Sequence, residues 1–168
     1  MSGRIFLLGD DIDTDQLAPG QYMKGGLDML AAHCLESARP DFAGSVKPGD
    51  VIVAGRNFGM GSSREQAAEA LKHLGLAGVV AKSFAGIFYR NALNLGLPVL
   101  VAEDIGGVED GDAVSLDPAA GELRLEAKNR TVRLEPLPDN LKPMLADGGL
   151  VPHLKKRFAA ERAKEAGA

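Results

Sequence analysis

Residues 57–65, which read Asn-Phe-Gly-Met-Gly-Ser-Ser-Arg-Glu, join a glycine-rich turn to a predicted helix start. The stretch presents two hydroxyl groups, from Ser62 and Ser63, beside the guanidinium of Arg64. A helix N-terminus leaves N–H groups unpaired and carries partial positive charge, and an arginine offers a planar fork that suits a carboxylate. The stretch therefore predicts an anion site that contains a hydroxyl able to act as a base.

The segments on either side place this turn between a strand and a helix. The apolar run at residues 50–54 predicts a buried strand, and residues 66–74 have helical spacing. Gly59 and Gly61 are expected to let the backbone of the turn approach a ligand closely.

The same turn also resembles three other motifs. Ser62 and Glu65 fit a Ser-x-x-Glu capping box, and on spacing alone a serine at a helix start is usually only a cap. A P-loop needs a lysine directly after its last glycine, where Ser62 follows Gly61. The dinucleotide fingerprint needs a glycine where Arg64 stands. Nucleotide binding is therefore the weaker hypothesis.

Four separated motifs carry a family resemblance. In chain order they are Asp13-Thr14-Asp15-Gln16, residues 57–65, Ser83-Phe84-Ala85 and Ile87-Phe88-Tyr89-Arg90-Asn91-Ala92. This order resembles that of the small subunits of 3-isopropylmalate dehydratase, and the chain looks like the swivelling domain of the aconitase superfamily. Several motifs in one order are more specific than any one of them.

The resemblance implies a hydro-lyase that dehydrates and rehydrates a malate-like acid. In that family an iron–sulfur cluster binds the departing hydroxyl, and a serine, here Ser62, takes the carbon-bound proton. Ser63 and Arg64 would hold a substrate carboxylate, and Asp15 matches an active-site aspartate. A serine is a poor base unless its alkoxide is stabilised, which a helix N-terminus and an arginine can do.

The cysteine count limits what this chain can bind. Cys34 is its one cysteine, and it lies in an apolar helical stretch where a core position is expected. A cubane cluster needs several cysteine thiolates. We therefore expect no metal or cofactor on this chain and a 4Fe-4S cluster on a large partner subunit.

The acidic loop at residues 9–26 is a second candidate region. A calcium loop starting at Asp10 would need glycine and glutamate where Asp15 and Gln21 stand, so calcium binding is not expected. Lys24 lies where the resembled family varies its substrate-reading loop. Its ammonium would either bind a further carboxylate or extend to water beside a smaller substrate.

These observations leave several functions open. The first is a small subunit that completes a 3-isopropylmalate dehydratase of leucine biosynthesis. The second is a small subunit of a homoaconitase-type or methylmalate/citraconate-type hydratase, which also acts on a small di- or tricarboxylic acid. The third, of a different class, is a stand-alone anion-binding module.

Composition excludes other partners. The net charge of −4 and the 5% aromatic content argue against nucleic acid. No apolar run reaches the ~18 residues of a membrane span, and the N-terminus does not read as a signal sequence. A cytoplasmic protein is expected. His33, His73 and His153 lie outside the motifs, so surface or interface roles are expected for them.

Strand and helix patterns alternate along the first part of the chain, which favours parallel pairing. Strands are expected at residues 4–8, 50–54, 78–81 and 98–101, and helices at 27–37, 66–74 and 86–95. An antiparallel meander at 113–116, 122–126 and 131–134 and helices at 141–145 and 150–163 should follow.

With the resemblance, this pattern predicts an α/β fold. Residues 1–168 should form a single swivelling β/β/α domain with a mixed, barrel-like sheet flanked by helices. The C-terminal helix, residues 150–165, should pack on this domain or extend from it.

Overall fold

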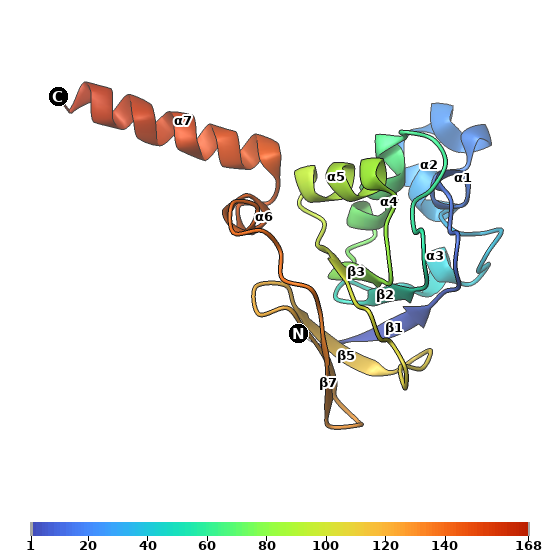
Figure 1. The fold of residues 1–168 in the computed structure, drawn as a ribbon. Helices are drawn as coiled ribbons and strands as arrows, with labels where there is room; N and C mark the ends of the chain where they lie inside the picture. The colour runs from blue at the N-terminus through green and yellow to red at the C-terminus, as the bar shows by residue number, and fades with distance from the viewer. Residues whose placement is uncertain (1, 168) are drawn as a thin grey trace.

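The computed structural model describes residues 2–167, and these contain a seven-stranded sheet with the order β4-β3-β2-β1-β5-β6-β7 (Figure 1). The first four strands pair in parallel: β1 (Gly3–Leu7), β2 (Val51–Ala54), β3 (Gly78–Ala81) and β4 (Val99–Val101). Antiparallel strands extend the sheet beyond β1: β5 (Ala113–Asp117), β6 (Glu122–Leu125) and β7 (Arg130–Arg133). The predicted mixed sheet is confirmed.

Residue patterns explain the two halves of this sheet. Every residue of β2 and β3 is buried, as expected for parallel strands that are covered on both faces. In β7 only Val132 is buried, and its neighbours Thr131 and Arg133 are exposed. Such alternation is typical of an antiparallel strand with one face in water.

Three helices lie on one side of the parallel strands, with β5 and β7 on the far side (Figure 1). They are α2 (Leu27–Ala32), α4 (Glu65–His73) and α5 (Gly86–Asn94). The apolar core between these layers includes the fully buried rings of Phe6, Phe42 and Phe58. Among residues 2–167, no helix combines the length and apolar character needed to span a membrane.

Helix α2 is shorter than predicted. The expected helix at residues 27–37 ends at Ala32, because Leu35 takes a left-handed conformation with φ 61°. The Leu35 amide donates to the Gln16 carbonyl at 2.8 Å instead of to an intrahelical carbonyl. Short elements that the sequence did not indicate are α1 (Thr14–Leu17), the 3₁₀ helix η1 (Gly20–Gly25) and α3 (Phe42–Ser45).

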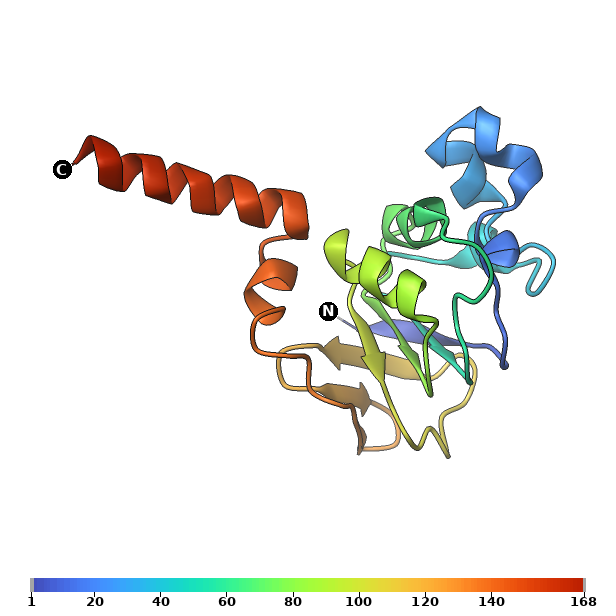
Figure 2. The same cartoon turned by 45° about the horizontal axis from the view of Figure 1, so that its top comes forward.

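The C-terminal helix α7 (Leu150–Ala166) follows α6 (Lys142–Ala146) and projects away from the sheet (Figure 2). No residue of α7 is buried. Its first turns are attached through Asp147, which bonds His153 at 2.7 Å and Lys156 at 3.0 Å. Hydrogen bonds from these two side chains hold the pKa of Asp147 below its usual range.

Cys34 lies in the core, as the sequence predicted. Its thiol is fully buried, and loss of solvation raises its pKa to about 12. Because the thiolate is the form that binds metals, Cys34 is not suited to ligate an ion.

Candidate active site

The turn at residues 57–64 meets two other loops at the carboxyl ends of β1, β2 and β3. The Gly59 amide donates to the Ile12 carbonyl at 2.7 Å, and the Phe58 amide donates to the Ser83 carbonyl at 3.0 Å. Ligands of parallel α/β sheets bind at this end of the strands. The three motifs of the first half of the chain are thus brought together.

The Ser62 hydroxyl lies on the surface of this loop cluster. Its Oγ is 3.1 Å from the Oγ1 of Thr14, and the Ser62 amide donates to the same Thr14 oxygen at 3.1 Å. Ser62 and Ser63 are both exposed, whereas Thr14 is only 2% exposed. The Ser63 carbonyl accepts a bond from Nδ2 of Asn91, on α5, at 3.4 Å. The predicted base is therefore accessible from outside.

Arg64 connects this turn to α1 and its C-terminal cap. Its Nη1 pairs with the Asp15 carboxylate and donates to the Ala18 carbonyl at 3.2 Å. Among the described residues, neither Nε nor Nη2 of Arg64 has a hydrogen-bond partner. The guanidinium is thus anchored by one nitrogen and keeps two nitrogens, Nε and Nη2, for an incoming carboxylate.

The structure contradicts the predicted capping box at Ser62 and Glu65. Helix α4 has Arg64 at its N-cap and no side-chain cap, so Ser62 lies before the helix and bonds Thr14 instead. The capping box forms at α1, where the Gln16 amide donates to the Asp13 carboxylate at 2.8 Å and the Gln16 side chain accepts from the Asp13 amide at 2.9 Å. The Ser62 hydroxyl is therefore not used to cap a helix.

The two glycines of the turn are required by contacts inside the protein. Gly59 has φ 85°, and a Cβ there would lie 2.2 Å from Cγ of Phe88. Gly61 has φ 105°, and a Cβ there would lie 3.1 Å from the Thr14 Oγ1. Glycine at these positions lets Phe88 support the turn and lets Thr14 approach Ser62.

Replacing Gly59 with alanine should lower the free energy of unfolding by about 2–4 kcal/mol, because left-handed backbone and overpacking against Phe88 both add strain. Urea unfolding would measure the loss. Gly86→Ala is the matched control, since a Cβ there meets no atom within 4 Å. The control should unfold within about 1 kcal/mol of the original chain, and equal stability of both variants would contradict this account.

Lys24 lies in η1, and its side chain is exposed. Within residues 2–167 no hydrogen bond or ion pair connects Lys24 to the Ser62 turn. The same segment is fixed by Tyr22, whose ring stacks on His33 at 3.6 Å between centroids. The structure therefore joins Asp15 to Arg64 beside Ser62 and Ser63, whereas within residues 2–167 Lys24 makes no hydrogen bond or ion pair with this group.

The three histidines pair with surface carboxylates. His33 bonds Glu36 at 2.6 Å, and His73 pairs with Asp28 at 2.7 Å. Among the described residues, no group of three histidine, cysteine, aspartate or glutamate side chains is placed to hold a metal ion.

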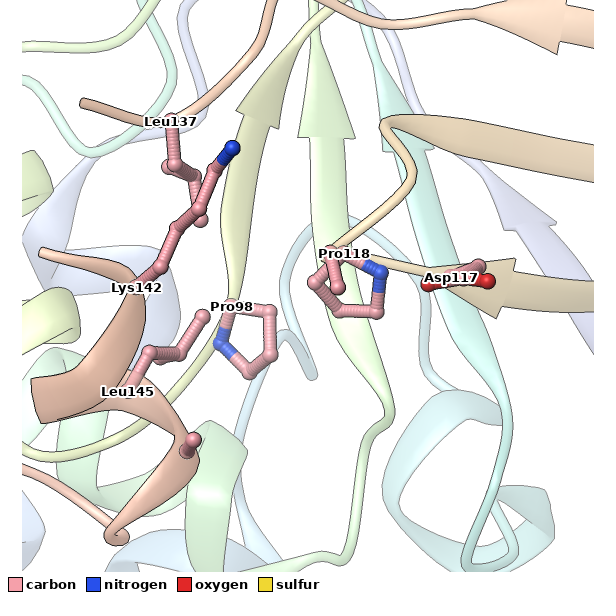
Figure 3. A pocket seen from close by; sticks show the side chains of 8 residues that line it. Pro98, Asp117, Pro118, Leu137, Lys142 and Leu145 are labelled. Atoms are coloured by element: carbon pink, nitrogen blue, oxygen red, sulfur yellow. The ribbon is translucent and has the colours of Figure 1, made fainter. Parts of the chain in front are cut away.

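A cavity of about 250 Å³ lies away from the loop cluster (Figure 3). It is lined mainly by apolar side chains, among them Pro98, Pro118 and Leu145. Pro98 precedes β4, so this cavity lies at the opposite end of the parallel strands from Ser62. Four further cavities lie among the described residues. Neither these four nor the cavity in Figure 3 is lined by Ser62, Ser63 or Arg64.

Comparison with known proteins identifies the family to which this chain belongs. Residues 36–104 match the model of the aconitase C-terminal domain. The chain is 51% identical to the methanogen homoaconitase small subunit of Methanothermobacter thermautotrophicus over 155 residues, which cover 92% of this chain and 90% of that one. It is 48% identical to 3-isopropylmalate dehydratase small subunit 2 of Archaeoglobus fulgidus over 158 residues, covering 93% and 95%. The chain belongs to the dehydratase small-subunit family of the aconitase superfamily.

A solved structure agrees with this family assignment. The fold superposes on the crystal structure of 3-isopropylmalate dehydratase from Methanocaldococcus jannaschii with a TM-score of 0.91 and 46% identity. The match covers 97% of this chain and 98% of that one. The resemblance and the fold class predicted from the sequence are both confirmed, and the dehydratases of this family are hydro-lyases.

Two residues of the candidate site were not singled out from the sequence. Thr14 contacts Ser62, and Asn91 contacts the backbone of Ser63. Both lie within motifs that carry the resemblance, but spacing along the chain does not indicate which motif residues meet. Thr14 and Ser62 are 48 positions apart.

Proposed function

We propose that this chain supplies the base and a carboxylate clamp to a two-subunit hydro-lyase that isomerises a substituted malate. The observation that carries the proposal is the exposed Ser62 hydroxyl beside an arginine that keeps free donors. A site on an open surface suits a chain that needs a second protein to enclose its substrate. A stand-alone binding module would instead be expected to bury its ligand in a pocket of its own.

The residues of this chain do not fit an iron–sulfur cluster. Such a cluster needs several thiolates, and Cys34 is a buried thiol with a pKa of about 12. We therefore assign the 4Fe-4S cluster to a large partner subunit. Small-subunit names among the relatives support the existence of that partner.

Each polar residue of the loop cluster has a role in this proposal. The Ser62 Oγ, in its deprotonated form, accepts the carbon-bound proton of the substrate during dehydration and becomes the neutral hydroxyl, which returns the proton during rehydration. The free Nε and Nη2 of Arg64 bind a substrate carboxylate, and the Ser63 hydroxyl adds a further donor. Asp15 holds Arg64 through Nη1, so that its two free nitrogens keep a fixed orientation.

The proposed substrate is 3-isopropylmalate. The dehydratase name recurs among the relatives, including those from Archaeoglobus fulgidus and Halothermothrix orenii. A homocitrate-type acid is the second candidate, because the homoaconitase small subunit is 51% identical and the exposed Lys24 offers a cation for a third carboxylate.

Reconstitution tests the proposal. The purified chain would be mixed anaerobically with a cluster-loaded large subunit, and isopropylmalate, homocitrate-type and methylmalate-type acids would be compared as substrates. Turnover should require both subunits and should be fastest with isopropylmalate. Turnover by this chain alone, or tight phosphate binding with no turnover after mixing, would contradict the proposal.

Replacing Lys24 with alanine should change the preference between acids if the loop reads a third carboxylate. The ratio of kcat/KM for homocitrate-type acid to that for isopropylmalate should fall about 10- to 100-fold, the range for one hydrogen bond to a charged group. Lys155→Ala removes an exposed lysine of α7 and serves as the control. An unchanged ratio in Lys24→Ala would make Lys24 a surface residue without a role in selection.

A further inference from the structure

Thr14 is one of two buried polar residues in the described part of the chain, and the other is Asp50. Asp50 has an evident structural task, since it accepts bonds from the amides of Arg4 at 2.9 Å and Lys47 at 2.8 Å. The side-chain bonds of Thr14 lead only to Ser62. Its hydroxyl is therefore committed to the residue that we propose as the base.

The hydrogen-bond pattern fixes the direction of the Thr14–Ser62 contact. The Ser62 amide donates to the Thr14 Oγ1 and occupies an acceptor site on that oxygen. The Thr14 proton has one acceptor within reach among the described residues, the Ser62 Oγ at 3.1 Å. Because a buried hydroxyl proton without a partner is unfavourable, Thr14 donates to Ser62.

The backbone around Thr14 holds this donor firmly. The Thr14 amide donates to the Met60 carbonyl at 2.9 Å, and the Thr14 carbonyl accepts from Ala18 at 2.8 Å. Threonine is branched at Cβ, which restricts its side-chain rotamers. The absence of a side chain at Gly61 leaves room for the hydroxyl, as described above.

We propose that Thr14 is a positioning residue that orients the Ser62 hydroxyl and stabilises its deprotonated form by donating a hydrogen bond. This inference rests on the proposed role of Ser62 as the base. Thr14 keeps its own proton throughout: the substrate proton passes to the Ser62 Oγ, and no bond of Thr14 breaks. A donor aimed at a developing negative charge lowers the energy of the basic form.

The test is Thr14→Val in the complex reconstituted with the cluster-bearing large subunit. Valine keeps the branched shape and removes the donor. The value of kcat should fall about 10- to 100-fold, as for a lost hydrogen bond to a charged group, while KM changes little. Losing the donor raises the pKa of Ser62, so the rising limb of the kcat–pH profile should move to higher pH. Thr14→Ser keeps the donor and should retain most of the activity.

Other outcomes overturn the inference. Thr14→Val also removes the acceptor of the Ser62 amide, so complex assembly and Tm are measured beside the rates. A purely structural role would lower Tm or assembly without moving the pH profile. If Thr14→Val does not assemble, Thr14→Ala gives the same readout with a smaller side chain. An unshifted profile in the variant that assembles, or equal losses in it and in Thr14→Ser, would overturn the role of Thr14.

Ser62→Ala separates this inference from the proposed function. If Ser62→Ala stays active, the base assignment fails and the Thr14 inference fails with it. If Ser62→Ala is inactive and Thr14→Val matches the original chain in rate and pH profile, only the Thr14 inference fails.

Discussion

Replacing Ser62 with alanine is expected to lower kcat of the reconstituted enzyme by about 10²- to 10⁴-fold, the usual contribution of a positioned general base. The side chain is exposed and does not cap α4, so its loss removes little packing. Stability should fall by about 1–3 kcal/mol, because the buried Thr14 hydroxyl loses its acceptor. Turnover at saturating substrate is the measurement, with size-exclusion chromatography to verify assembly.

Ser63→Ala provides the matched comparison for Ser62→Ala. Ser63 is the adjacent exposed serine, and in the proposed mechanism its hydroxyl binds substrate without accepting a proton. Its removal should raise KM more than it lowers kcat, because uniform binding is lost. If both variants lost kcat equally, or if Ser62→Ala kept full activity, the assignment of the base to Ser62 would be wrong.

Replacing Arg64 with lysine is expected to lower kcat/KM by about 100-fold, although the charge is kept, since a charge-assisted bidentate contact contributes about 2–3 kcal/mol. Arg64 uses Nη1 for Asp15 and the Ala18 carbonyl and keeps Nε and Nη2 for the substrate. An ammonium is a point charge, so it cannot hold the Asp15 loop and present a fork at the same time. Steady-state kinetics on the reconstituted complex measure the loss.

Arg56→Lys is the control for Arg64→Lys. Arg56 is an exposed arginine at the start of the same turn, and its bonds to Asp10 and Asp11 use backbone atoms. The same chemical change at this position should leave kcat/KM roughly unchanged. If kcat/KM fell equally in Arg64→Lys and Arg56→Lys, the loss would not be specific to position 64, and the carboxylate clamp at Arg64 would be contradicted.

Most of the regular fold could be predicted from local sequence patterns. The buried runs of β2 and β3 and the alternation in β7 indicated parallel and antiparallel pairing, and β3 was predicted at its observed bounds. Helix α2 was predicted too long. The Leu35 amide, inside the predicted range, donates to the carbonyl of Gln16 in another segment, and the helix ends before it at Ala32. The four residues of α1 are too few to produce a helical period.

The site was predicted in part. The Ser-Ser-Arg sequence indicated an anion site, and the structure pairs Arg64 with Asp15 of α1, 49 positions away. The capping role of Ser62 was wrong, because Ser62 contacts Thr14, a residue 48 positions away that the local Ser-x-x-Glu motif does not indicate. The role of Lys24 in selecting the acid stays a prediction.

The sequence by itself determined the chemical groups, the order of the strands and the longer helices, and the limit that one cysteine places on cluster binding. These properties depend on residue type and on short-range periodicity. Only the tertiary structure decided that Thr14 meets Ser62, that the two glycines serve internal contacts, and that Ser62, the proposed base, is exposed. Such features arise where parallel strands end side by side, so they depend on the packing of distant segments.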